Sequence, residues 1–82
     1  MSRAVLTSNS VRVGRGGRRT SVRLEPEFWW ALLRIADRRG ETISDLCGHV
    51  AANPVSVSFS SSLRVFALQQ LSAIAAAEAA HP

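Results

Sequence analysis

The sequence predicts a mostly helical domain that carries one short β-strand ahead of its helices. Residues 18–24 alternate between polar and apolar with a period of two, and three later stretches have the apolar spacing of helices. A chain of 82 residues forms one small domain and buries little apolar surface by itself. A lone strand leaves backbone N–H and C=O groups unpaired, so we expect it to pair with the same strand of a second copy. The chain is therefore expected to be a homodimer.

The strand is predicted to have one apolar and one cationic face. Val22 and Leu24 are expected to face the core, which puts Arg19, Ser21 and Arg23 together on the outward face. The six arginines that precede residue 25 have no acid among them, whereas the rest of the chain has four arginines and six acids. This charge asymmetry indicates a polyanionic partner, nucleic acid before membrane, and a solvated basic tail is the alternative.

Residues 1–17 form a basic N-terminal segment for which two interpretations stay open. Residues 1–10 show no sustained period and are expected to be a mobile arm. The segment 11–13 alternates like a strand, and the glycine-rich residues 14–17 allow it to fold back as a hairpin on the strand that follows. The other interpretation is a flexible Gly/Arg arm that lies along a phosphate backbone.

The first helix is expected to begin at Pro26, which is tolerated at the first helical position, and to end at Gly40. Its apolar face is predicted to consist of Phe28, Trp29, Leu32, Leu33, Ile35 and Ala36. Trp30 falls outside this face. Either Arg34 stacks over its exposed ring, or the C-terminal helix or another protein covers it.

The second helix is expected to begin at Thr42, with Asp45 completing a capping box. Cys47 is predicted to be a small buried hydrophobe, and His49 points to a different side of the helix, so the two make no metal or catalytic pair. No pair or triad of His, Cys and carboxylate residues has a spacing suited to catalysis. We therefore expect no enzyme activity, no cofactor and no metal.

Residues 54–82 are expected to form a linker and a third helix. Val55, Val57 and Phe59 alternate with serines, which suggests an extended segment that lays apolar side chains on the helices. The third helix is predicted to begin at Ser60 or Ser61 and to fray along its alanine-rich end. The chain shows neither a signal-peptide core nor an apolar run of membrane length, so a cytoplasmic protein is expected.

Two stretches of the chain resemble a known family. Arg-Thr-Ser-Val-Arg-Leu-Glu-Pro-Glu-Phe-Trp, followed later by Ser-Ser-Ser-Leu-Arg-Val-Phe, resembles a short bacterial subgroup of the ribbon-helix-helix DNA-binding proteins, the family of the Met and Arc repressors. The resemblance to the ribbon-helix-helix family itself covers roughly residues 18–52, and the later stretch resembles a further helix of the subgroup. It implies an intertwined homodimer whose antiparallel β-ribbon enters the major groove of double-stranded DNA while the start of the second helix touches phosphates. The third helix would be an addition to this fold.

The resemblance and the basic arm together predict the site residues and a division of the chain. Residues 1–17 would be the arm, 18–53 the ribbon-helix-helix core and 54–82 the linker and third helix. Base contacts are expected from Arg19, Ser21 and Arg23, and phosphate contacts from Arg12, Arg15, Arg18, Thr42, Ile43 and Ser44, the last three through backbone amides. The dimer core is expected to contain Val22, Leu24, Phe28, Trp29, Leu32, Ile35, Leu46 and Val50.

The predicted function is that of a homodimeric, sequence-specific, nucleoid-associated DNA-binding protein that acts as a repressor of transcription. The alternative is an antitoxin-like or other protein-interaction module, in which the apolar C-terminal helix binds a toxin-like or other partner.

Overall fold

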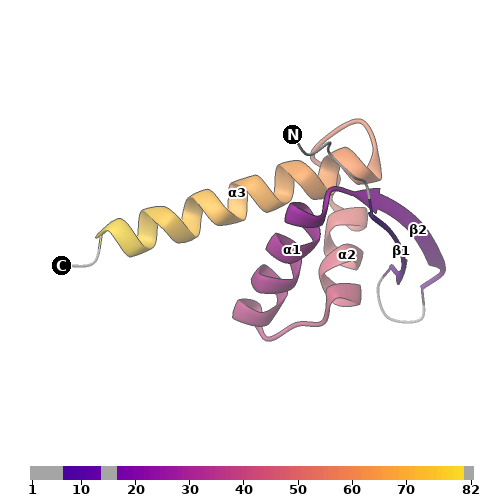
Figure 1. Cartoon of the computed structure of the whole chain (residues 1–82), viewed down its shortest axis with the longest axis horizontal. Coiled ribbons are helices and arrows are strands. Elements are labelled where there is room, and N and C mark those ends of the chain that lie inside the picture. Colours follow the sequence, from indigo (N-terminus) through magenta and orange to yellow (C-terminus); the bar gives the residue numbers. More distant parts are fainter. Residues whose placement is uncertain (1–6, 14–16, 81–82) are drawn as a thin grey trace, which may run out of the picture.

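A two-stranded ribbon and three helices make up the chain in the computed structural model, which describes residues 7–13 and 17–80. The elements are β1 (Thr7–Arg12), β2 (Arg19–Leu24), α1 (Pro26–Arg39), α2 (Ile43–Ala52) and α3 (Phe59–Ala80). Figure 1 shows α1 and α2 side by side, the ribbon along one side of them, and α3 extending well beyond the other elements. A mostly helical fold with a short ribbon and an additional C-terminal helix is thus confirmed.

The ribbon is a hairpin within one chain. β1 pairs antiparallel with β2, with Ser10 opposite Ser21 and Arg12 opposite Arg19. The Val13 N–H donates to the Arg18 carbonyl at 3.0 Å, which continues the ladder one pair towards the turn. Our expectation that β2 lacks a partner in its own chain is therefore wrong, and the hairpin interpretation is confirmed.

The partner strand is also longer than the segment 11–13 that the sequence suggests. Residues 7–10, which fall in the predicted mobile arm, are part of β1. This stretch reads Thr-Ser-Asn-Ser and has no apolar alternation, so it carries none of the periodicity that indicates a strand. Its backbone groups pair because β2 lies beside them. Residues 1–6 of the predicted arm lie outside the described residues.

Local signals define the ends of α1 as predicted. Pro26 begins the helix, and Glu25 before it has extended backbone angles. Gly40 ends it with φ of 66°, a left-handed conformation that glycine adopts without a steric penalty. The N–H groups that follow, of Gly40 and Glu41, donate to the carbonyls of Asp37 and Ala36 at 3.1 and 2.9 Å. The chain can therefore reverse sharply into α2.

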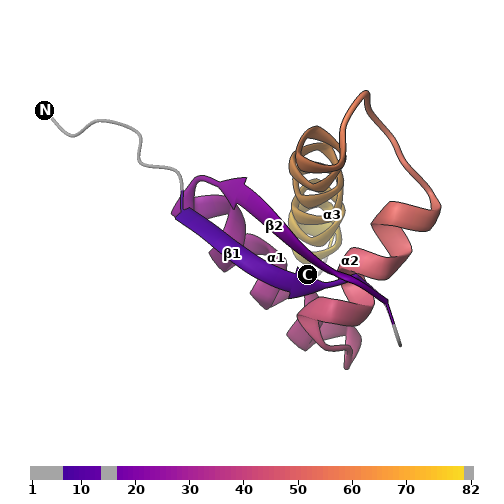
Figure 2. The same cartoon turned by 90° about the vertical axis from the view of Figure 1, so that its right-hand side faces the viewer.

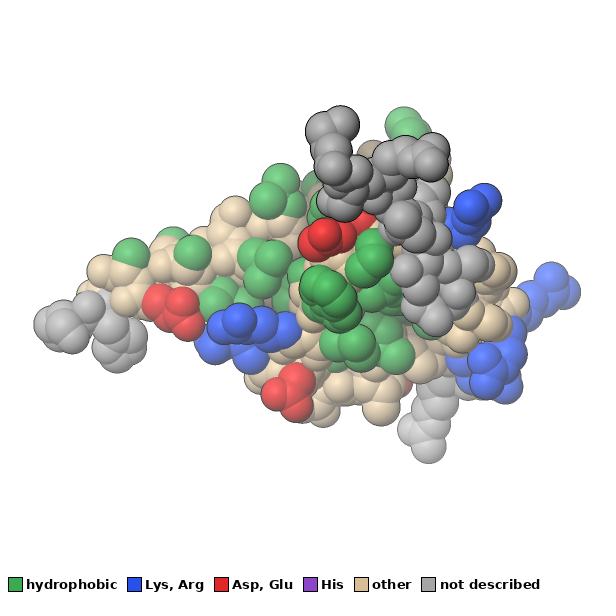
Figure 3. Space-filling view, viewed as in Figure 1, with side chains coloured by type: hydrophobic (Ala, Val, Ile, Leu, Met, Phe, Trp, Pro, Cys, Tyr) green, Lys and Arg blue, Asp and Glu red, His purple; other side chains and the backbone are tan. Residues whose placement is uncertain are grey.

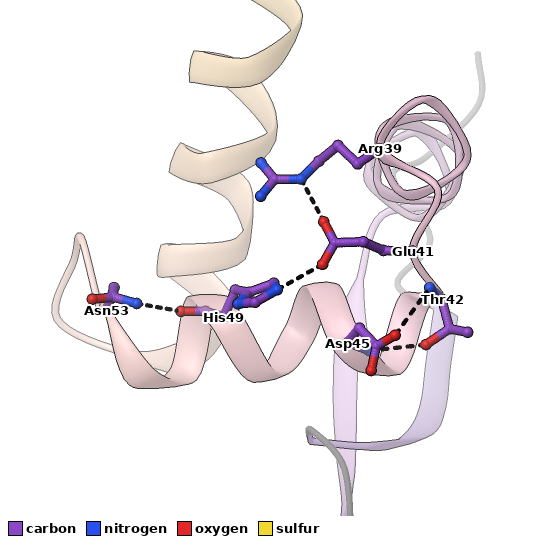
Figure 4. Close-up of polar contacts among 6 residues, drawn as sticks. All are labelled: Arg39, Glu41, Thr42, Asp45, His49 and Asn53. Carbon is purple, nitrogen blue, oxygen red and sulfur yellow. Dashed lines mark hydrogen bonds and ion pairs between the residues drawn. The ribbon is translucent and has the colours of Figure 1, made fainter.

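A complete capping box holds the start of α2, as the sequence predicts. The Asp45 N–H donates to the Thr42 hydroxyl oxygen at 3.0 Å, and the Thr42 N–H donates to the Asp45 carboxylate at 3.5 Å. Figure 4 shows both contacts. Two of the amides that have no partner inside the helix are satisfied in this way.

We expect Thr42→Ala to lower the free energy of unfolding by about 1 kcal/mol, because it removes the acceptor that caps α2. Urea denaturation at constant protein concentration measures the loss. Thr42→Ser is the matched control, since it keeps the hydroxyl, and it should retain most of the stability. Equal stability of the alanine and serine variants would show that the cap contributes nothing.

The segment between α2 and α3 differs from our prediction. Val57 is 100% exposed, so its side chain does not lie on the helices, and Val55 is 46% exposed. Of the three apolar residues expected to lie on the helices, Phe59 packs partly buried against the core. The N–H groups of Val55 and Ser56 both donate to the buried Ser62 hydroxyl, at 3.3 and 3.1 Å. These bonds fold the segment around a polar side chain and prevent an extended strand. α3 begins at Phe59 rather than at Ser60 or Ser61, and at this end of the helix the Ser61 N–H donates to the Ser58 hydroxyl oxygen at 3.1 Å.

The core lies between the inner face of the ribbon and the three helices. Eight residues were expected in the dimer core, and seven of them are buried within this single chain, whereas Phe28 is partly buried against the core. The seven buried residues are Val22, Leu24, Trp29, Leu32, Ile35, Leu46 and Val50. Cys47 is also buried, as predicted, and burial raises the pKa of its thiol to about 11. Such a thiol stays protonated at neutral pH and is a poor nucleophile.

Candidate nucleic-acid interface

The outward face of β2 carries the row of side chains that the sequence predicts. Val22 and Leu24 are buried, and Arg19, Ser21 and Arg23 are exposed on the opposite face. The buried pair anchors the strand on the helices, so the three outward residues are attached to a supported backbone. All three predicted base-contacting residues are therefore presented together to solvent.

The hairpin adds β1 residues to this face. In an antiparallel pair, residues directly opposite each other point to the same side, so exposed Ser10 and Arg12 lie on the same face as Ser21 and Arg19. From the sequence, Arg12 is expected to lie in the arm, and Ser10 has no predicted role. Only the register of the hairpin brings them to this surface, and that register cannot be derived from β1's own sequence.

The arginines of the ribbon differ in how they are held. Arg12 Nη1 donates to the Gly17 carbonyl at 2.9 Å, and Arg19 Nη1 donates to the Ser10 carbonyl at 3.3 Å. Both bonds are exposed and are therefore readily exchanged for bonds to a ligand. The Arg23 guanidinium makes no hydrogen bond or ion pair within the described residues. Arg18 is exposed near the turn, and Arg15 lies outside the described residues.

The start of α2 is attached to the turn end of the ribbon. The Ser44 hydroxyl donates to the Arg12 carbonyl, and Ile43 packs partly buried near Val11 of β1. Three backbone N–H groups were predicted to contact phosphate. The Thr42 N–H already donates to the Asp45 carboxylate. The N–H groups of Ile43 and Ser44 lie in the first turn of α2, where backbone N–H groups have no carbonyl partner inside the helix. The positive end of α2 thus lies beside the arginines of the hairpin.

Two acids outside the ribbon, Glu25 and Glu41, are each paired with a basic side chain of a helix. Arg64 of α3 donates to Glu25 at 2.9 Å, and this hydrogen bond holds the pKa of the Glu25 carboxyl below its usual value. Arg39 bonds Glu41 at 2.5 Å and likewise lowers its pKa, while His49 Nε2 lies 2.6 Å from the other Glu41 oxygen (Figure 4). Neither strand contains an acid. The ribbon end of the molecule, where arginine side chains gather in Figure 3, keeps its positive charge.

Metal-binding and membrane-spanning features are both absent from the described part of the chain. Within residues 7–13 and 17–80, no group of three His, Cys, Asp or Glu side chains is placed to hold a metal ion. None of the helices in these ranges has the length and apolar character needed to cross a membrane.

Comparison with known proteins yields a family and a similar structure. No curated protein matches the chain. The solved structure of an uncharacterized protein from Bordetella pertussis Tohama I is 32% identical, with a TM-score of 0.67 over 96% of this chain. The chain spans 64% of that protein's length. The family model of the ribbon-helix-helix domain matches residues 6–79, which include β1 and nearly all of α3 as well as the expected core. The chain therefore belongs to the ribbon-helix-helix domain family, which supports a DNA-binding, regulator-type role.

Proposed function

We propose that this protein is a homodimeric, sequence-specific repressor that inserts the outer face of its β-ribbon into the major groove of double-stranded DNA. The observation that carries this proposal is the like-charged pair of Arg12 and Arg19, which stand directly opposite each other on an outward face. Like charges in such a pair destabilise a sheet unless an anion lies between or above them. A phosphate backbone supplies that anion.

The dimensions of the ribbon suit the groove. The major groove admits a two-stranded ribbon, and outward residues on one strand are about 7 Å apart, or about two base-pair steps. Arg19 and Arg23 therefore reach different parts of the groove. The α2 amides of Ile43 and Ser44 can bond a phosphate at the groove's edge, since the ribbon turn lies beside them.

A second copy would pair through β2 rather than β1. Because Val13 and Arg18 form a hydrogen-bonded pair, the backbone groups of Arg19 and Arg23 point away from β1. The outer edge of β1 is less available for such pairing, because two of its carbonyls already accept hydrogen bonds. The Arg12 carbonyl accepts from the Ser44 hydroxyl, and the Ser10 carbonyl accepts from Arg19. Pairing of β2 with its copy would give a four-stranded sheet with both cationic faces on one side, and a site with two-fold symmetry.

Titration of random-sequence duplex DNA at several salt concentrations tests the proposal. Arg19→Gln should weaken binding and reduce the slope of log affinity against log salt by about 0.9, which is the loss of one phosphate contact. Arg38→Gln is the matched control, because it removes one exposed arginine of α1, outside the ribbon. If both variants bind like the wild type, the ribbon is not the DNA-binding surface.

A further inference from the structure

A groove lies beneath the turn end of the ribbon. It has a volume of about 520 Å³ and is formed by β2, α2, α3 and the segments at residues 13 and 54–58; its lining residues are Val13, Thr20, Val50, Ala51, Pro54, Ser56, Val57, Ser58, Phe59 and Ser62. Figure 2 shows the elements that contribute these residues, namely the ribbon, α2, α3 and the segment that connects the two helices. The volume is within the range of pockets that bind small molecules in proteins.

The lining indicates the chemistry of a ligand. None of the lining residues is charged, which disfavours phosphate, nucleotides and charged peptides. The aromatic ring of Phe59 and the side chains of Val50 and Ala51 offer apolar contact, and fully exposed Val57 adds an apolar rim. The half-buried Thr20 hydroxyl has no hydrogen bond within the described residues, so it is available to a ligand.

The groove is held open by bonds that do not involve a ligand. The Ser62 hydroxyl accepts from Val55 and Ser56 and donates to the Ser56 carbonyl at 3.4 Å. The Ser58 and Ser61 side chains bond each other at 3.1 Å at the start of α3. The rim of the groove is therefore ordered before a ligand binds, so binding costs little conformational entropy of the protein.

The position of the groove connects it to the DNA surface. Val13 and Thr20 line its ribbon side, and the arginines 12 and 19 next to them are exposed on the outer face. A molecule that fills the space between the ribbon and the helices supports the hairpin end from below. A supported ribbon loses less conformational freedom when it enters DNA, so the two binding events reinforce each other.

We infer that this groove binds an uncharged, largely apolar small molecule with at least one hydrogen-bonding group, and that its occupancy increases DNA affinity. The coupling to DNA rests on the function proposed above, whereas binding in the groove does not. A ligand-controlled regulator follows from the two together.

Indole is a suitable probe, since it is uncharged, aromatic and has one N–H donor. At ten times its Kd, indole should raise the Tm of the wild type by about 5 °C or more. Ala51→Trp fills the groove and should abolish this shift, whereas the matched control Ala73→Trp, at an exposed position of α3, should keep it. Benzoate, a charged aromatic, should give no shift. No indole shift in the wild type, or an equal shift in Ala51→Trp, would overturn the groove as the site.

The coupling is tested by DNA titration with and without saturating indole. Affinity of the wild type should rise at least about fivefold, and that of Ala51→Trp should not respond. An unchanged or lower affinity would overturn the coupling. If Ala51→Trp altered the sedimentation of the protein without indole, the groove would be an interface between copies, which also overturns the proposal. Indole binding without any DNA binding would contradict the proposed function but leave the groove as a ligand site.

Discussion

Leu32→Ala is expected to lower the free energy of unfolding by about 2 to 5 kcal/mol, a larger loss than the loss of the Thr42 cap is expected to cause. Leu32 is fully buried on α1, within the cluster that joins the ribbon to all three helices. Truncation removes apolar contacts and leaves a cavity that the surrounding helices can fill only in part. A small domain has a total stability of about 5 to 15 kcal/mol, so the substitution should remove a large part of it.

Urea denaturation followed by circular dichroism measures this loss, at one protein concentration because association changes apparent stability. Leu68→Ala is the matched control, since it makes the same chemical change on α3 at a residue that is 65% exposed. It should change stability by less than about 0.5 kcal/mol. A loss below about 1 kcal/mol at Leu32 would mean that the core is not where the structure puts it.

Arg23→Ala is expected to reduce affinity for a selected DNA site by about 1 to 3 kcal/mol, or roughly 5- to 150-fold, with a much smaller effect on random DNA. Within the described residues, the guanidinium of Arg23 makes no hydrogen bond or ion pair, and Arg23 lies between the buried residues Val22 and Leu24. A side chain on a fixed backbone can align its planar fork with the O6 and N7 atoms of guanine. Arg19 is nearer the turn and already bonds Ser10, so it suits phosphate better.

Sites selected from random DNA, followed by titration of the best site and of random duplex, measure this discrimination. Arg38→Ala is the control for the loss of one positive charge from an exposed position outside the ribbon. Its ratio of specific to random affinity should equal that of the wild type. Equal losses on both DNAs for Arg23→Ala would assign Arg23 to phosphate and contradict its role in base recognition.

Features that depend on neighbouring residues along the chain were predicted from the sequence. The alternation of β2 placed Val22 inward and Arg23 outward because strand side chains point to opposite faces, whatever the partner strand is. Pro26, Gly40 and the Thr42 capping box marked helix ends because each acts within one turn of backbone. The predicted base-contacting row follows from the same local rule.

Features that depend on contacts distant in sequence were decided only by the tertiary structure. β1 has no sustained apolar alternation of its own, and it is a strand because β2, beyond the glycine-rich turn, supplies its hydrogen bonds. The outward position of Val57 follows from two amide bonds to Ser62, which no periodicity reveals. Trp30 is 66% exposed, so α3 does not cover it, and among the described residues no arginine stacks over its ring.

The candidate site shows the same division. Arg19, Ser21 and Arg23 could be found from the sequence, since one strand determines which of its side chains share a face. The addition of Ser10 and Arg12, the bond from Ser44 to β1 and the groove beneath the ribbon required the register of the hairpin and the packing of three helices. Local backbone geometry can be deduced from a few adjacent residues, whereas pairing and packing depend on which distant segments bury each other's surface, and that is a property of the folded chain.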